Sequence, residues 1–180
     1  KTGGLADVAG ALPQALVNES GGEVAPALFL PLYRQVRESV AADPNLELCD
    51  TGVEVSVPFS LGPEKARFWQ VKGHGGPPVY FLDAPHRYDR ARLYDDESGR
   101  AYEDNLYRYA LLCRGVLEGA TALLGAVPDV VHAHDWQGSL ALAYLPTRYL
   151  ATHARCAAVL TIHNLAYQGV FPKEQLALTG

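Results

Sequence analysis

The chain has 180 residues, of which 48% are hydrophobic and 19% are charged, and its formal net charge is −5. This composition is typical of a globular domain with a sizeable core and excludes a disordered polar chain. The acidic balance argues against non-specific binding of nucleic acid or acidic membranes. The sequence contains no run of 18 apolar residues, which is the length that could cross a bilayer.

The first predicted element is a helix that follows a glycine-containing loop. Apolar residues recur in it at helical spacing and predict one buried face: Leu5, Val8, Ala9, Leu12 and Leu16. Pro13 predicts a kink or an early end, because an interior proline costs about 3 kcal/mol. The loop-like start at Lys1 and a helix barely begun over residues 174–178 favour a fragment that lacks its first strand and everything after this domain.

Short strands are predicted through the middle of the chain. Residues 24–30 form a mostly buried strand ended by Pro31, although Pro26 weakens this prediction because proline cannot donate to a strand ladder. Three further strands are expected over residues 53–59, 68–71 and 79–82, the first of which alternates apolar and polar residues. We expect them to be a partly antiparallel insertion in an otherwise parallel sheet.

The second half alternates helices with strands. After an exposed, charged loop over 87–99, a long helix begins near Tyr102, with Asp104 in its first turn. The elements that follow are a strand over 129–133, a helix over 139–149 that Pro146 bends or ends, and a strand over 157–162. This alternation predicts an α/β fold with a Rossmann-like, doubly wound, mostly parallel sheet.

The most informative stretch runs from Pro128 to Gln137. A short apolar strand, interpreted as buried, is followed directly by His134, Asp135 and Trp136. The later apolar strand is followed by His163 and Asn164. Ligands of open α/β sheets bind outside the carboxyl ends of the strands. We therefore expect the two strand ends to share one site.

The glycines near the start predict an anion site. Gly3 and Gly4 precede a helix whose first N–H groups are unpaired, and Lys1 adds a positive charge. The spacing matches neither a Walker loop nor a dinucleotide fingerprint. A tight turn that merely leads into a helix is the alternative interpretation.

Other chemistries have less support. His132 and His134 share a strand face and could reach one metal ion, but Asp135 comes one place too early for a metallo-hydrolase cluster, and a core imidazole is the simpler interpretation of His132. The sequence contains no Gly-x-Ser-x-Gly elbow and no disulfide or metal-knuckle cysteine pattern. A phosphorylated or nucleotide sugar suits the groups that remain, which are a carboxylate, an imidazole, amides and the rings of Trp136 and Tyr167. Core packing is the alternative interpretation of the two rings.

Several motifs in one order resemble the bacterial glycogen synthases and plant starch synthases. They are Lys1-Thr2-Gly3-Gly4-Leu5-Ala6-Asp7-Val8, Tyr94, Asp104-Asn105 with Arg108-Tyr109, His132-Ala133-His134-Asp135-Trp136-Gln137, and Thr161 to Gly169. The resemblance implies that residues 1–180 are the N-terminal domain of a two-domain GT-B glycosyltransferase. Its active site would lie in a cleft shared with a C-terminal domain of the same chain.

The resemblance also implies an activity and roles for residues. Such enzymes transfer glucose from ADP-glucose to the non-reducing end of an α-1,4-glucan with retention of configuration, without a metal or other cofactor. Catalytic roles would fall to His163 and Asp135. Donor contacts would come from Lys1, Gly3, Gly4, Asp7, His163 and Asn164, and glucan contacts from Tyr94, Trp136 and Tyr167.

Small departures from the family pattern affect loops: Gly138-Ser139 replaces a usual Thr-Gly, and Leu142 stands where proline is common. A cytoplasmic enzyme is expected, or a plastid one in a plant, and the fragment alone is expected to be inactive. Two rival functions remain open, a non-catalytic glucan-binding module and a metal-dependent hydrolase.

Overall fold

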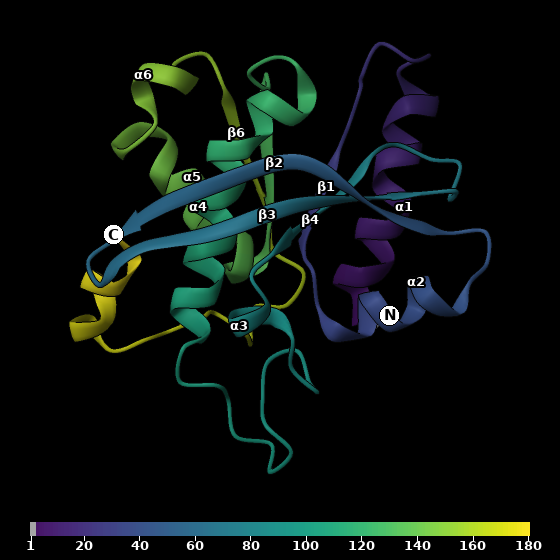
Figure 1. Cartoon of the computed structure of the whole chain (residues 1–180). Coiled ribbons are helices and arrows are strands. Elements are labelled where there is room, and N and C mark those ends of the chain that lie inside the picture. The colour runs from purple at the N-terminus through teal and green to yellow at the C-terminus, as the bar shows by residue number, and fades with distance from the viewer. Residues whose placement is uncertain (1–2) are drawn as a thin grey trace.

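The computed structural model describes residues 3–180 and arranges the strands in two sheets (Figure 1). The larger sheet has the order β1-β4-β3-β2. Its strands are β1 (Leu28–Pro31), β2 (Glu47–Phe59), β3 (Gly62–Lys72) and β4 (Val79–Asp83). The smaller sheet pairs β5 (Val130–His134) with β6 (Ala157–Thr161).

Strand directions confirm the α/β fold with parallel sheet elements. β1 pairs with β4 in parallel, and β5 pairs with β6 in parallel. β3 runs antiparallel to both of its neighbours, so the middle of the chain is the antiparallel insertion that its alternating pattern predicted.

The helices surround these sheets. Their bounds are α1 (Gly3–Glu19), α2 (Arg34–Ala42), α3 (Pro85–Tyr88), α4 (Asn105–Leu124), α5 (Asp135–Thr147), α6 (Leu150–His153) and a 3₁₀ turn, η1 (Lys173–Thr179). Short α2 and α3 were not predicted, although Val36 and Val40 lie one turn apart on α2 and pack against a buried cluster. α4 ends at Gly125, whose left-handed φ of 75° suits a residue without a side chain.

Helix α1 differs from its prediction in two ways. It continues unbroken across Pro13 to Glu19, so the predicted early end is wrong: a proline removes one hydrogen bond, while the turns on either side keep theirs. Its apolar face is also only half-buried, and Leu16 remains 37% exposed. α1 therefore contributes no side chain to the three buried clusters of the described chain.

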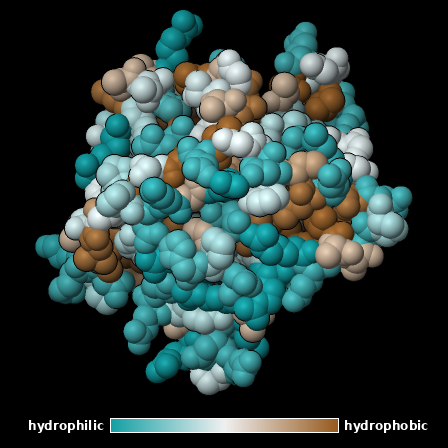
Figure 2. Space-filling model, in the orientation of Figure 1, coloured by the Kyte–Doolittle hydropathy of each residue, from teal (hydrophilic) through white to brown (hydrophobic). Residues whose placement is uncertain are grey.

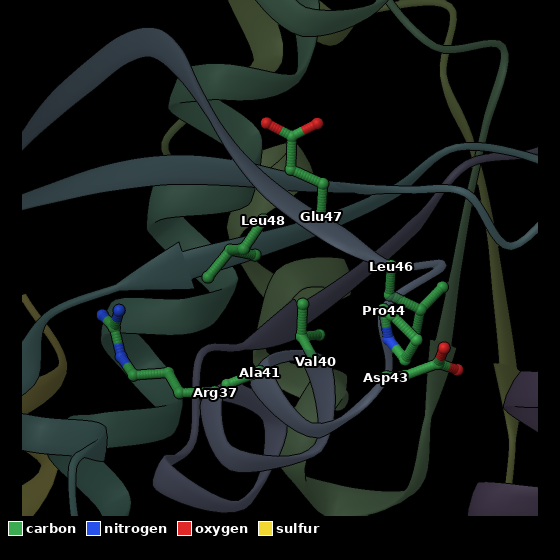
Figure 3. A pocket seen from close by; sticks show the side chains of 8 residues that line it. All are labelled: Arg37, Val40, Ala41, Asp43, Pro44, Leu46, Glu47 and Leu48. Atoms are coloured by element: carbon green, nitrogen blue, oxygen red, sulfur yellow. The ribbon is translucent and has the colours of Figure 1, made fainter.

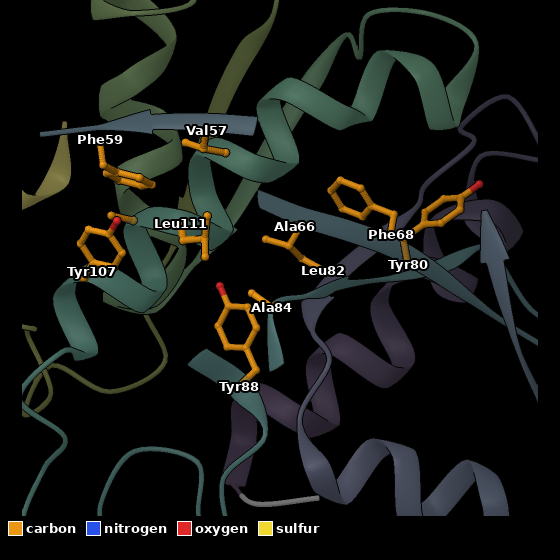
Figure 4. Close-up of a cluster of buried hydrophobic side chains, with 11 residues drawn as sticks. Val57, Phe59, Ala66, Phe68, Tyr80, Leu82, Ala84, Tyr88, Tyr107 and Leu111 are labelled. Atoms are coloured by element: carbon orange, nitrogen blue, oxygen red, sulfur yellow. The ribbon is translucent and has the colours of Figure 1, made fainter. Parts of the chain in front are cut away.

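The core forms around α4. One face of this helix packs on the large sheet, in a cluster of Val57, Phe59, Ala66, Phe68, Tyr80, Leu82, Ala84, Tyr88, Tyr107, Ala110 and Leu111 (Figure 4). A Cβ at Gly119 would lie 2.3 Å from the Phe68 ring, so this glycine lets the helix approach the sheet. The opposite side of α4 packs on α5 through Cys113, Leu117, Ala141 and Tyr144.

The two strands at the predicted site are less buried than expected. Val130 of β5 is 51% exposed, and Val159 and Leu160 of β6 are 42% and 43% exposed. The prediction that the strand over 129–133 is buried is therefore wrong, since an apolar run reports composition and not the layers that cover it. Elsewhere the surface is mixed: the face in Figure 2 is largely hydrophilic, with separate apolar areas. No helix within residues 3–180 is long and apolar enough to span a membrane.

Candidate functional site

The parallel register of β5 and β6 brings two chain segments to one edge. His134 lies opposite Thr161, so the residues that follow each strand emerge side by side. α5 begins at once with Asp135, which is held at a left-handed φ of 53°. Its Oδ1 accepts a hydrogen bond of 2.7 Å from the backbone N–H of His163. One carboxylate thus ties the two strand ends together.

Three imidazole rings gather at this junction. His134 Nδ1 lies 3.0 Å from His163 Nε2, and the two rings are stacked within 14° of parallel. His132 also stacks on His134, with a centroid distance of 4.3 Å, and its Nε2 lies 2.7 Å from Thr161 Oγ1. The sequence predicted that His163 and Asp135 meet, and the structure adds His134 as the direct partner of His163.

The electrostatics keep the central ring uncharged. Burial is the largest cause that lowers the pKa of His134, and repulsion from protonated His132 or His163 lowers it further. Asp135 opposes this shift. Because the charged form is disfavoured, His134 is a neutral donor or acceptor near neutral pH.

An aromatic row borders the histidines. Trp136 meets Tyr109 edge to face at 5.0 Å and tilts against Phe171 at 5.3 Å. Tyr94 lies on another side of Tyr109, with a centroid distance of 6.2 Å. Trp136 is therefore anchored by packing, which does not exclude a ligand on its remaining surface.

Tyr94 faces the start of α5. Burial is the main cause that raises the pKa of its hydroxyl, and the charge of Asp135 raises it further. The ring remains 38% exposed. Tyr94 thus combines an accessible face with a hydroxyl turned toward the Asp135 region.

A buried guanidinium holds the loop that carries Tyr94. Asn105 Nδ2 donates to the carbonyl of Tyr94 at 2.8 Å. Arg108 is fully buried and donates from Nη1 to Asn105 Oδ1 at 2.7 Å and to the Leu93 carbonyl at 3.1 Å. Sequence reasoning treated Arg108 only as part of a motif, but an arginine inside an otherwise apolar helix face was the available signal.

The other predicted site residues lie apart from these contacts. Lys1 is outside the described residues. Gly3 and Gly4 are the first residues of α1, so the prediction that they lie in a loop before the helix is wrong. Asp7 is exposed on the same helix. Asn164 accepts from the Ala166 N–H at 2.9 Å in a local turn, and Tyr167 is 71% exposed.

The possible metal ligands among the described residues do not converge on one position. Within residues 3–180 no group of three histidine, cysteine, aspartate or glutamate side chains has the geometry to hold an ion. His134 and His163 direct one ring nitrogen each at the other, and the ring of His132 stacks on that of His134.

A concave region elsewhere differs in chemistry. An open pocket of about 420 Å³ lies between α2 and the start of β2, lined by Arg37, Val40, Ala41, Asp43, Pro44, Leu46, Glu47 and Leu48 (Figure 3). Its lining has no imidazole and no aromatic ring. Sugar recognition favours the aromatic and imidazole side chains at the β5–β6 edge.

Comparisons with known proteins agree with one another. A family model described as the starch synthase catalytic domain matches residues 1–180. The glycogen synthase of Granulibacter bethesdensis is 41% identical over 179 residues, which cover 98% of this chain and 34% of the relative. The glycogen synthase of Methylocella silvestris is 43% identical over 183 residues, with 100% and 34% covered.

A solved structure has the same fold. The catalytic domain of starch synthase IV from Arabidopsis thaliana, bound to ADP and acarbose, superposes with a TM-score of 0.76 and 25% identity. The match covers 94% of this chain and 32% of that one. The chain thus spans about a third of the length of the curated relatives it matches.

Proposed function

From the premise that this chain belongs to the starch synthase catalytic domain family, we propose that it forms the N-terminal half of a two-domain, retaining glucosyltransferase. The reaction would move glucose from ADP-glucose to the non-reducing end of an α-1,4-glucan. The observation that carries the proposal is the 2.7 Å bond from the His163 N–H to Asp135, which assembles carboxylate and imidazole groups at the β5–β6 edge.

The chemistry requires stabilisation of a departing diphosphate. The bond between C1 of glucose and the β-phosphate oxygen breaks, and its electron pair leaves with ADP. The 4-hydroxyl oxygen of the glucan bonds to C1 and releases its proton. The leaving diphosphate gains negative charge, which the free N–H groups at the start of α1 and the ammonium of Lys1 would stabilise.

The site residues divide by what they can contact. His163 and Asp135 would orient the donor glucose, because an imidazole and a carboxylate can each bond a sugar hydroxyl. Gly3, Gly4 and Asp7 on α1 and Asn164 after β6 would complete the donor contacts. Tyr94, Trp136 and Tyr167 would offer ring faces to the glucan, and the 71% exposure of Tyr167 supports this role.

The structure of starch synthase IV, which is bound to ADP and acarbose, supports the proposal of a nucleotide and a sugar as ligands. The role of ADP-glucose in the present chain is carried over from that likeness and from the curated glycogen synthases. The glucan role rests on the same relatives and on the aromatic row beside Asp135.

The proposed partner is a C-terminal domain of the same protein. The relatives are about three times as long as this chain, since it covers 34% of each. A two-domain enzyme would close its cleft on the β5–β6 edge and complete the diphosphate site.

We propose the cytoplasm as its location, because Cys49, Cys113 and Cys156 are all unpaired. We also propose that the reaction uses no metal or other cofactor.

Transfer of labelled glucose tests the proposed function. A protein with the full length of the relatives is incubated with glycogen and ADP-glucose labelled in the sugar, and incorporation is compared with that of the 180-residue chain. Label should enter glycogen only with the longer protein, and an α-1,4-specific glucosidase should release it. Binding of glucan without transfer by the longer protein would favour the non-catalytic alternative.

A further inference from the structure

We propose that His134 is a positioning residue that sets the protonation pattern of His163. The inference rests on the proposed function, because it assigns a role within the same site. It starts from a direct contact, since Nδ1 of His134 lies 3.0 Å from Nε2 of His163. Two imidazole nitrogens at this distance need one proton between them, so the state of one ring dictates the state of the other.

The direction of the bond follows from the ligand chemistry. When His134 donates its Nδ1–H, Nε2 of His163 is the acceptor, and the remaining proton of neutral His163 lies on Nδ1. Nδ1 of His163 has no hydrogen-bond partner among the described residues. It is then a free N–H donor, which suits the hydroxyl and phosphate oxygens of a sugar nucleotide.

The surroundings keep this arrangement in place. His132 stacks on His134 from β5, and Asp135 holds the backbone of His163 from the start of α5. These are the titratable groups that face His134: His132 from its own strand, Asp135 from α5, and His163 from the segment after β6. Both the ring and the main chain of His163 are therefore held, so its free nitrogen points in one direction.

Two substitutions at His134 separate hydrogen bonding from packing. His134→Phe keeps a ring for stacking and removes the donor. His134→Asn removes the ring and places an amide N–H close to the former Nδ1 position. A packing role predicts that Phe is tolerated and Asn is not, whereas the proposed role predicts the reverse.

The experiment measures glucose transfer by the longer protein, with wild type in the same assay. We expect His134→Phe to lower kcat by about tenfold to a hundredfold with KM for glycogen little changed, and His134→Asn to recover most of the loss. Wild-type rates in His134→Phe would overturn the inference while leaving the proposed function intact. Absence of transfer by wild type would instead overturn the proposed function.

A second measurement does not depend on whether the His134 variants fold. Selective ¹⁵N labelling of histidine in the wild-type protein reports which nitrogen of each ring carries the proton. We expect one fixed tautomer of His163 with the proton on Nδ1, assigned by loss of its signals in His163→Gln. A proton on Nε2, or rapid averaging between the two nitrogens, would overturn the inference.

Discussion

Asp135 joins two strand ends by accepting a 2.7 Å hydrogen bond from the backbone N–H of His163. The two residues are 28 positions apart in the chain, and Asp135 forms this bond from a left-handed conformation with φ of 53°. Non-glycine residues adopt such a conformation at a cost, which aspartate and asparagine tolerate best. The Asp135 side chain therefore holds the backbone of His163 in place without a bound ligand.

Substitution of Asp135 separates its charge from its hydrogen bond. Asp135→Asn keeps an acceptor and tolerates the left-handed backbone, so its free energy of unfolding should stay within about 1 kcal/mol of wild type. Asp135→Ala loses both features and should be destabilised by about 1–3 kcal/mol. Urea unfolding of both variants checks this, and equal stability of wild type and Asp135→Ala would contradict the structural role.

Gly169 permits the close packing of Trp136. A Cβ at Gly169 would lie 2.5 Å from Trp136 Cδ2, and its φ of 63° already disfavours a side chain. Gly99 has a similar φ of 81° but open space around it, so Gly99→Ala measures the backbone effect alone. We expect Gly169→Ala to be about 1–3 kcal/mol less stable than Gly99→Ala, with altered tryptophan fluorescence. Matching stabilities would show that Trp136 is not packed as described.

Acid should weaken the fold through two histidines. Burial is the largest cause that lowers the pKa of both His134 and His153 below the ordinary value of 6.5. The unfolded chain then binds more protons than the folded one, so stability is complete above pH 6.5 and falls as pH drops toward the lowered folded pKa. Between pH 7.5 and pH 5, the free energy of unfolding should fall by less in His134→Asn and in His153→Asn than in wild type. An unchanged loss in both variants would contradict this assignment.

Lys1 is predicted to stabilise the departing diphosphate, although it lies outside the described residues. Lys1→Ala in the longer protein should lower kcat by about a hundredfold, which corresponds to about 2–3 kcal/mol for a lost charged contact. Lys1→Arg serves as the matched control, because it keeps the charge. Steady-state transfer measures both, and an intact rate in Lys1→Ala would show that the phosphate is held by other groups.

Much of this arrangement could be predicted from the sequence. Short apolar runs located the β5 and β6 ends, and the rule that ligands bind at such ends placed Asp135 and His163 together. The alternation within residues 53–59 likewise predicted an antiparallel insertion, which the structure confirms. Sequence patterns predict a helix or strand correctly where one hydrophobic period dominates the segment.

The rest depends on contacts that no local pattern carries. The bond between His134 and His163 joins residues 29 positions apart through ring orientations that depend on both strands. The exposure of Val130 and Val159 depends on which layers cover the small sheet, and the apolar composition of the strands does not contain that information. Buried Arg108 donates from Nη1 to the Leu93 carbonyl and to Asn105, and these contacts are visible only in three dimensions.

The central claim is that Asp135 and the imidazole pair form part of the active site of a glucosyltransferase. The most direct measurement is the rate at which the longer protein incorporates labelled glucose from ADP-glucose into glycogen, compared between wild type and Asp135→Asn. We predict clear incorporation by wild type and a rate at least tenfold lower in the correctly folded Asp135→Asn variant, because the negative charge facing the sugar is lost. Equal rates in the two proteins, or no incorporation by wild type, would contradict the account.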